Sequence, residues 1–347
     1  MTGLVLGGGG VRGSYQVGVY LALRKSHIKL DGFTGSSIGA FNAAMLASNR
    51  GSELLKFWQT TEIGKVIGFS DELIKLANSD KFDLKIIKAG FNDIVKIIKN
   101  KGISTDNLIN TVNSLNLEES LFKSKKDFGL VTVRAKDFKP IYVFKEDIKK
   151  GKLTDYLMAS CYLPIFKMEK LIDDNYYLDG GFYDYAPANA LINRGYDKVY
   201  VVDLDAIGFR RKYKDKDKVI VIKPSRKLGS IININESRVR ENILMGYYDT
   251  LKIVKNLDGY KYIFKNKSDS YYRFLIRKVS KKKLKEMQKL FRTINEKKLV
   301  LKALEYVMDK EDFSYYEVYS SMKVIKKVKK LDKDYGVYNF VKKMQFL

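Results

Sequence analysis

Two short apolar runs alternate with two glycine-containing turns in the first fifty residues, and this pattern restricts the fold most. Thr2–Leu6 is apolar and leads into four glycines, after which residues 14–25 place apolar side chains at helical spacing. A second run at Leu30–Thr34 leads into another glycine-flanked turn, and residues 40–47 are small and apolar. Such runs predict buried parallel strands, and two of them joined by a helix form a right-handed βαβ unit. The chain therefore begins as an α/β fold.

The rest of the chain predicts that this sheet is interrupted and then resumed. Residues 51–125 are rich in lysine and show helical periodicity with little strand signal, at Glu72–Ala77, Leu84–Lys88 and Ile94–Lys99. Further strands are expected at Phe128–Val133, Ile141–Phe144, Leu171–Leu178, Lys198–Leu204 and Lys218–Ile222.

After Pro224 the pattern is mainly helical, with one apolar stripe from Met287 through Leu290 and Ile294 to Met308 and another from Val318 to Val328. We therefore expect an α/β catalytic domain over residues 1–225, with a helical insertion at about 51–125 that can serve as a lid. A basic, mainly helical region is expected over residues 226–347.

Composition excludes several classes of protein. One cysteine, Cys161, and one histidine, His27, among 347 residues exclude a disulfide framework and a Cys/His zinc cluster. No run of about 18 uncharged apolar residues occurs, and the first residues carry no basic segment or cleavage-like site. We therefore expect neither a signal peptide nor a transmembrane helix, and the single cysteine indicates a reducing, cytoplasmic compartment. No cofactor or metal is expected, and peripheral membrane contact is expected from the charge considered next.

The net charge of +25 indicates an anionic partner such as a membrane surface, a nucleic acid or an acidic substrate. Residues 261–347 contain 24 lysines and arginines but only 10 acidic residues. The abundance of Lys, Ile, Asn and Tyr along the whole chain also matches the amino-acid usage of an AT-rich genome, which needs no function. No nucleic-acid-binding motif accompanies the lysines, so a membrane surface is the favoured partner. Nothing in the sequence fixes the oligomeric state.

The turn after the second predicted strand contains a candidate nucleophilic serine. Gly35-Ser36-Ser37-Ile38-Gly39 fits G-x-S-x-G, in which a sharp strand-to-helix turn exposes the central serine above the carboxyl end of a sheet. Gly35 and Gly39 leave room for that turn. Ser37 is therefore the candidate nucleophile.

A nucleophilic serine needs a base, and His27 is placed wrongly for that role. It follows the first predicted helix, at the amino end of the strands, whereas Ser37 lies at the carboxyl end, and a strand of this length spans about 17–20 Å. The leading candidate is Asp179, which ends a predicted strand and precedes Gly180 and Gly181. An aspartate followed by glycines is also a common turn sequence, so this motif alone does not settle a function. To act as a general base at neutral pH, Asp179 would need a raised pKa, which partial burial beside the serine would provide.

Consecutive glycines at residues 7–10, followed by Arg12 and Gly13, form the third motif. Their backbone N–H groups can bind an anion, either a phosphate or the oxyanion of a tetrahedral intermediate. The same residues satisfy G-x-G-x-x-G, the dinucleotide-binding fingerprint, which also requires an acidic residue at the end of the second strand. Asp31 lies at the wrong end of that strand, so the dinucleotide interpretation is disfavoured.

Together these motifs resemble the patatin-like phospholipase family. The resemblance rests on G-G-G-x-R-G, on G-x-S-x-G-A within about 25 residues of it, and on D-G-G downstream. Met158–Phe166 is also similar to the family's A-S-x-A-x-P-x-x-F block, although Tyr162 stands where a small residue is common. The matching blocks extend from residue 3 to about residue 205, and no family motif is visible beyond about residue 225.

The resemblance implies a three-layer α/β fold with a mainly parallel central sheet, and a calcium-independent Ser-Asp dyad. By its pattern, Ser37 would take the acyl group, Asp179 would act as general base, and the N–H groups of Gly8, Gly9 and Gly10 would form the oxyanion hole. Arg12 matches the family's arginine and is expected to support the glycine loop.

The expected function is therefore hydrolysis of fatty acyl esters of phospholipids or related lipids. A non-catalytic lipid- or nucleic-acid-binding protein on a hydrolase scaffold is the alternative. The intact serine, aspartate and glycine loop argue against that alternative.

Overall fold

The computed structural model describes residues 1–60, 66, 102–231 and 235–345, which form two compact units, Met1–Asp249 and Thr250–Leu347. The predicted helices at Glu72–Ala77, Leu84–Lys88 and Ile94–Lys99 lie outside the described residues.

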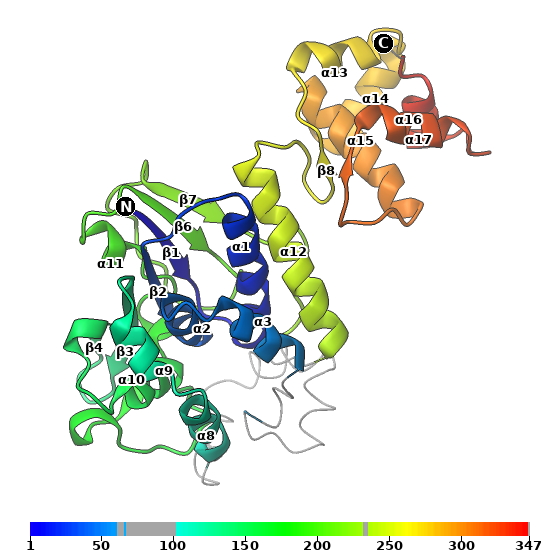
Figure 1. Ribbon diagram of the computed structural model, residues 1–347. Coiled ribbons are helices and arrows are strands. Elements are labelled where there is room, and N and C mark those ends of the chain that lie inside the picture. Colours follow the sequence, from blue (N-terminus) through cyan, green and yellow to red (C-terminus); the bar gives the residue numbers. More distant parts are fainter. Residues whose placement is uncertain (61–65, 67–101, 232–234, 346–347) are drawn as a thin grey trace. The chain divides into compact units, whose positions relative to one another are not determined.

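The first unit is built on a seven-stranded sheet in the order β4-β3-β2-β1-β6-β7 (Figure 1). The remaining strand, β5, pairs with β3. Strands β1, β2, β3, β6 and β7 are parallel, whereas β4 and β5 each pair antiparallel with β3. The strands are β1 (Thr2–Leu6), β2 (Gly32–Ser36), β3 (Asp127–Arg134), β4 (Lys139–Phe144), β5 (Tyr177–Leu178), β6 (Lys198–Val202) and β7 (Val219–Ile222). The mainly parallel α/β sheet predicted from the sequence is confirmed.

Helices cover both faces of this sheet. On one face, Leu191 of α11 (Ala188–Ile192) packs with Val5, Val199 and Val201 of the strands. On the other face lie α2 (Ile38–Ala47), which contacts β1, β2 and β3, and α10 (Leu153–Cys161), which contacts β3. Nine of the ten residues of α2 are buried, as its small apolar sequence predicts.

Two glycines bring α1 (Ser14–Lys25) and α12 (Glu236–Val254) into close contact. A Cβ atom on Gly18 would lie 1.9 Å from the Ile243 carbonyl oxygen, and one on Gly246 would lie 2.0 Å from the Tyr15 carbonyl oxygen. Most of α12 therefore belongs to the first unit, and the boundary between the units falls at residue 249, later than the expected division at residue 225. The sequence showed the change in pattern after Pro224, whereas the boundary depends on which helix α12 packs against.

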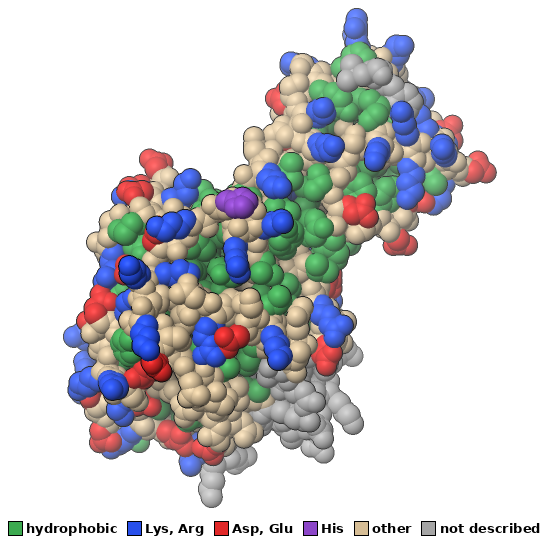
Figure 2. All heavy atoms as spheres, viewed as in Figure 1, with side chains coloured by type: hydrophobic (Ala, Val, Ile, Leu, Met, Phe, Trp, Pro, Cys, Tyr) green, Lys and Arg blue, Asp and Glu red, His purple; other side chains and the backbone are tan. Residues whose placement is uncertain are grey.

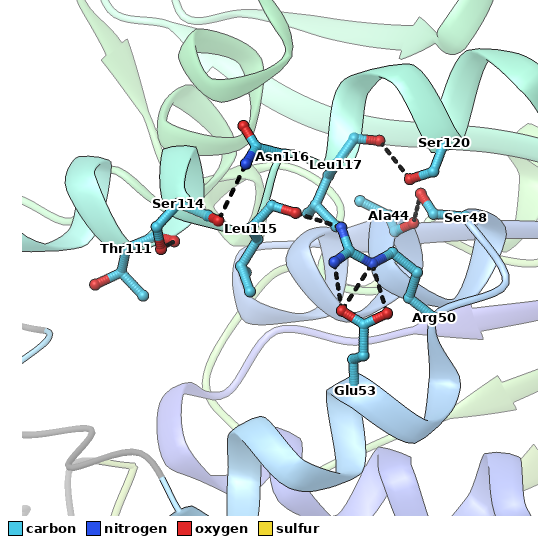
Figure 3. A network of polar contacts seen from close by, with 10 residues as sticks. All are labelled: Ala44, Ser48, Arg50, Glu53, Thr111, Ser114, Leu115, Asn116, Leu117 and Ser120. Atoms are coloured by element: carbon cyan, nitrogen blue, oxygen red, sulfur yellow. Dashed lines mark hydrogen bonds and ion pairs between the residues drawn. The ribbon is translucent and has the colours of Figure 1, made fainter.

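The described ends of the insertion are α3 (Gly51–Thr60) on one side and α8 (Asp106–Ser114) and α9 (Leu117–Lys123) on the other. Arg50 joins them, because its guanidinium pairs with Glu53 of α3 and also donates to the Leu115 carbonyl between α8 and α9 (Figure 3). The two flanks of the insertion are thus tied together beside the sheet.

The second unit is a helical cluster arranged around α15 (Glu296–Lys310), which contacts four other helices of the unit. These helices are α13 (Asp269–Ile276), α14 (Lys281–Phe291), α16 (Ser321–Lys329) and α17 (Gly336–Lys342), accompanied by the short parallel pair β8 (Ile263–Phe264) and β9 (Val318–Tyr319). The mainly helical character expected for this region is observed.

Three details of the expected elements are wrong. The stripe from Met287 to Met308 is not one buried face, because Arg292 adopts a left-handed conformation that ends α14 and leaves Ile294 86% exposed. Val318 lies in β9 and not on the helix that follows. The strand expected at Leu171–Leu178 shrinks to Tyr177–Leu178, because Asp173 and Asp174 have positive φ angles that form a turn.

Across the described parts of the chain, no helix combines the length and apolarity needed to cross a bilayer.

Candidate active site

Ser37 occupies a sharp, strained turn between β2 and α2. Its φ and ψ angles are 55° and −134°, a conformation that a residue with a side chain rarely adopts. The flanking glycines allow the turn, because a Cβ atom on Gly35 would lie 2.2 Å from the Gly39 carbonyl oxygen and one on Gly39 would lie 2.0 Å from the Leu6 carbonyl oxygen. Strained backbone of this kind is typical of functional residues. The G-x-S-x-G motif therefore forms the elbow that its sequence predicts.

Asp179 is buried directly after β5, with 5% of its surface exposed. Its Oδ1 atom accepts a hydrogen bond from the Gly181 N–H at 2.8 Å, while Oδ2 is buried and has no hydrogen-bond partner among the described residues. Gly180 is required here, since a Cβ atom on it would lie 2.2 Å from the Val131 carbonyl oxygen.

The environment of Asp179 changes the pKa of its carboxyl group. Burial raises the pKa of Asp179 to about 6, against the smaller lowering effects of the Ser37 hydroxyl and the Gly181 N–H. A carboxylate with this pKa is ionised at neutral pH and yet accepts a proton more readily than an exposed aspartate. Ser37 and Asp179 line the same cavity.

The end of α10 holds the backbone of both residues. The Ser37 N–H donates to Ser160 Oγ at 3.0 Å, and the Asp179 N–H donates to the Tyr162 carbonyl at 2.8 Å. Ser160 Oγ in turn donates to the Val131 carbonyl of β3 at 2.7 Å. The segment Met158–Phe166 therefore connects the elbow to the aspartate. Cys161 lies between Ser160 and Tyr162 in this segment. Desolvation and the negative charge of Asp179 raise the pKa of its thiol.

The glycine loop lies against the serine. A Cβ atom on Gly8 would lie 3.3 Å from Ser37 Cβ, but the Gly8 N–H already donates to the Tyr185 carbonyl at 3.1 Å. The N–H groups of Gly9 and Gly10 have no acceptor among the described residues. Of the three expected oxyanion donors, Gly9 and Gly10 are therefore the available pair.

Arg12 supports this loop from the side. Its Nε atom donates to the Gly229 carbonyl at 2.8 Å and its Nη1 atom to the Asp205 carbonyl at 3.1 Å. These bonds connect the glycine loop to two other segments beside the site.

A buried polar network behind the loop was missed by the sequence analysis. Asn42 of α2 donates from Nδ2 to the Gly13 carbonyl and to Gln16 Oε1, and its Oδ1 atom accepts from the Trp58 indole N–H. Gln16 donates to the Gly7 carbonyl at 2.7 Å. The network thus binds the carbonyl groups of Gly7 and Gly13, which lie at the two ends of the glycine loop. The sequence signal that could have revealed this network is the presence of polar residues within apolar helical patterns. Such residues are buried, and buried polar groups need hydrogen-bond partners.

A cavity of about 370 Å³ opens beside Ser37 and Asp179. Its walls are largely apolar and include Phe57 and Trp58 of α3 and Leu108 and Val112 of α8. The insertion therefore contributes directly to the wall of the cavity. The other apolar lining side chains are Val11, Ile38, Phe41, Val66, Leu157, Met158, Leu163, Ile165, Phe166, Ala206, Ile207 and Ile231.

His27 is exposed in the loop between α1 and β2, with a φ angle of 58°. Its neighbours in the chain lie at the amino ends of the strands, where the Asp31 N–H donates to the Thr2 carbonyl. The structure therefore does not bring it to Ser37. Within the described residues, no group of three or more His, Cys, Asp or Glu side chains is placed to hold a metal ion.

Comparison with known proteins finds relatives that are similar in sequence and solved structures that are similar in fold. Lysophospholipase NTE1 of Kluyveromyces lactis is 26% identical over 275 residues, which are 76% of this chain and 17% of that protein. Patatin-like phospholipase domain-containing protein 7 of Rattus norvegicus is 53% identical over 47 residues, which are 14% of this chain and 4% of that protein. The chain thus spans only a small part of the length of these relatives. Among solved structures, VipD from Legionella pneumophila matches with 14% identity and a TM-score of 0.48, covering 98% of this chain and 83% of VipD.

The family model described as patatin-like phospholipase matches residues 4–192, which include the glycine loop, the elbow and the buried aspartate. This match covers more than half of the chain. The chain belongs to the patatin-like phospholipase family.

Proposed function

We propose that this protein is a serine lipid acyl hydrolase in which Ser37 and Asp179 form a catalytic dyad. The observation that carries the proposal is the pairing of a strained, cavity-facing serine with a buried aspartate whose pKa is raised to about 6. Family membership supports the reaction class, and the relatives named lysophospholipases support an acyl lipid as substrate.

The geometry supports acyl transfer in two steps. In the first, Asp179 takes the proton of the Ser37 hydroxyl as Oγ attacks the acyl carbonyl carbon, and the N–H groups of Gly9 and Gly10 stabilise the oxyanion. The ester bond breaks, the leaving alkoxide takes the proton from Asp179, and the acyl group remains on Ser37. In the second step Asp179 takes a proton from water, which attacks the acyl-enzyme and releases the fatty acid, and the proton returns to Ser37.

The cavity favours an acyl chain as the group that is bound. Its lining consists mainly of aliphatic and aromatic side chains, with Ser37, Asp179 and the glycine loop as the polar elements beside the reacting atoms. Burying an apolar chain contributes about 0.8 kcal/mol per methylene group, which supplies affinity without head-group contacts. The substrate class is therefore a phospholipid, a lysophospholipid or a related acyl ester.

The second unit is proposed to attract the protein to anionic membranes. Lysine and arginine side chains are spread over the visible face of both units (Figure 2). Each cation near an anionic bilayer can contribute about 1 kcal/mol, and the excess in residues 261–347 is 14 charges. The described flanks of the insertion, α3 and α8, form part of the cavity wall and are proposed to help cover the substrate. The middle of the expected lid lies outside the described residues.

The test is the release of free fatty acid from mixed phospholipid vesicles, and of product from a soluble short-chain ester, with EDTA present. Wild type should be active, whereas Ser37→Ala and Asp179→Asn should each lose about 10³-fold or more in kcat. His27→Ala is the control and should retain full activity. Equal activity in wild type and Ser37→Ala would contradict the dyad. An inactive wild type that binds vesicles or DNA would favour a binding protein on a hydrolase scaffold.

A further inference from the structure

Three large apolar side chains are exposed on chain segments that border the catalytic cavity. Ile207 is 78% exposed, Phe209 is 66% exposed and Phe182 is 42% exposed. They lie on two segments, one directly after Gly181 and the other in the loop between β6 and β7. We call these three residues the apolar rim.

One rim residue lines the cavity, and the other two lie on backbone connected to Gly181, which also lines it. Ile207 lines the same cavity as Ser37, and Phe182 follows Gly181, whose N–H binds the catalytic carboxylate. An apolar surface that leads into an apolar cavity gives an acyl chain a path from a lipid phase to the serine that avoids water. The rim is therefore placed where a lipid would enter.

The backbone beneath the rim is firmly held. The Phe209 N–H donates to the Gly181 carbonyl at 3.0 Å, and the Phe209 carbonyl accepts from the Tyr185 N–H at 2.7 Å. Gly208 packs so closely that a Cβ atom on it would lie 3.0 Å from the Tyr185 side chain. Phe209 is thus exposed on a fixed backbone that is bonded to the segment following Asp179, which suits it to a defined interaction.

Cations flank the rim on one side. Residues 207–214 contain four cations and no acidic residue. Arg210 is neutralised by the buried Asp203 at 3.0 Å, whereas Arg211, Lys212 and Lys214 make no ion pair with a carboxylate of the described residues. Arg211 stacks on the Tyr183 ring at 3.5 Å and Lys214 donates to Asn193 Oδ1 at 2.9 Å, so both side chains are positioned.

We propose that the apolar rim and the cations Arg211, Lys212 and Lys214 form a docking surface for an anionic lipid bilayer. Phe182, Ile207 and Phe209 enter the boundary between head groups and acyl chains, and the three cations bind the lipid phosphates. Exposed apolar side chains beside basic residues are the usual composition of an interfacial membrane surface. This proposal rests on the proposed function, and it places the first contact at the cavity mouth, in addition to the longer-range attraction of the basic second unit.

The first test separates docking from chemistry. Phe182→Ser/Phe209→Ser should lower hydrolysis of vesicles of 70% phosphatidylcholine and 30% phosphatidylglycerol about tenfold or more, and should leave turnover of a soluble short-chain ester within about twofold. The same change in a Ser37→Ala background should weaken flotation with these vesicles by a similar factor. Phe182→Leu/Phe209→Leu, which keeps the surface apolar, should restore both properties. Undiminished flotation of the serine variant would overturn the proposal.

The second test does not depend on activity. The native Trp58 is buried, so Phe209→Trp in a Ser37→Ala background adds an indole at the rim whose emission is read by difference from the parent. Emission should shift to the blue on the anionic vesicles and be quenched by lipids brominated on their acyl chains. Emission from the added indole that is neither shifted nor quenched would overturn the docking surface. Because Ser37→Ala is inactive by design, this result stands apart from that of the hydrolase assay.

Discussion

Ser160 Oγ accepts a hydrogen bond from the Ser37 N–H at 3.0 Å and donates one to the Val131 carbonyl of β3 at 2.7 Å. This buried hydroxyl satisfies the backbone N–H of Ser37, the residue whose φ angle is 55°. Ser160 therefore holds the backbone of Ser37 and is not itself among the residues that line the cavity.

Removing the Ser160 hydroxyl should slow the chemical step. Ser160→Ala leaves the Ser37 N–H without its acceptor, so we expect kcat on a soluble ester to fall about tenfold while KM changes less than about twofold. Ser48→Ala is a matched control, because Ser48 is also buried and its hydroxyl donates to the Ala44 carbonyl at 2.7 Å, away from the elbow. Equal loss of kcat in both variants would show a general effect of instability.

Activity should follow the ionisation of Asp179. Because Asp179 is proposed to act as the base in its carboxylate form and its pKa is raised to about 6, kcat/KM should fall below pH 6 and level off above about pH 7. The measurement is the pH profile for a soluble ester from about pH 4.5 to about pH 8.5, where vesicle charge plays no part. A profile that is flat across the acidic half of this range would contradict the raised pKa of Asp179.

The same pKa predicts a stability cost. The folded state holds the Asp179 proton more tightly than the unfolded chain does, so ionisation lowers the free energy of unfolding as pH rises from about 4 to about 6. Asp179→Asn removes this cost and should raise the free energy of unfolding at about pH 8 by about 1–3 kcal/mol, with a smaller gain at about pH 4.5. Urea denaturation of the two proteins at both pH values measures the difference. A gain that does not depend on pH would need another cause.

Backbone strain at Ser37 should appear in a pair of inactive variants. Ser37→Gly and Ser37→Ala both remove the hydroxyl, but only glycine adopts a φ of 55° and a ψ of −134° without strain. We expect Ser37→Gly to be the more stable by about 1 kcal/mol in denaturant unfolding. The same pair of substitutions at Ser48, which lies at a φ of −74°, should favour alanine or show no difference.

Local sequence patterns were sufficient to predict the parallel α/β character of the first unit and the candidate dyad. The apolar run at Thr2–Leu6 has the same bounds as the observed strand, and the G-x-S-x-G spacing predicted the turn at Ser37 because only glycines fit there. His27 was excluded as a base by its position relative to the strands. These features are local, so a short stretch of residues contains the whole signal.

Contacts between distant segments decided the remaining features. The raised pKa of Asp179 comes from burial, the Gly8 N–H is taken by Tyr185, and the boundary between the units follows α12 because Gly18 and Gly246 let it pack on α1. The apolar rim exists because hydrogen bonds join Phe209 to Gly181 and Tyr185 across the sequence. Burial and hydrogen bonding between remote residues are not encoded in local periodicity, so only the folded chain could show them.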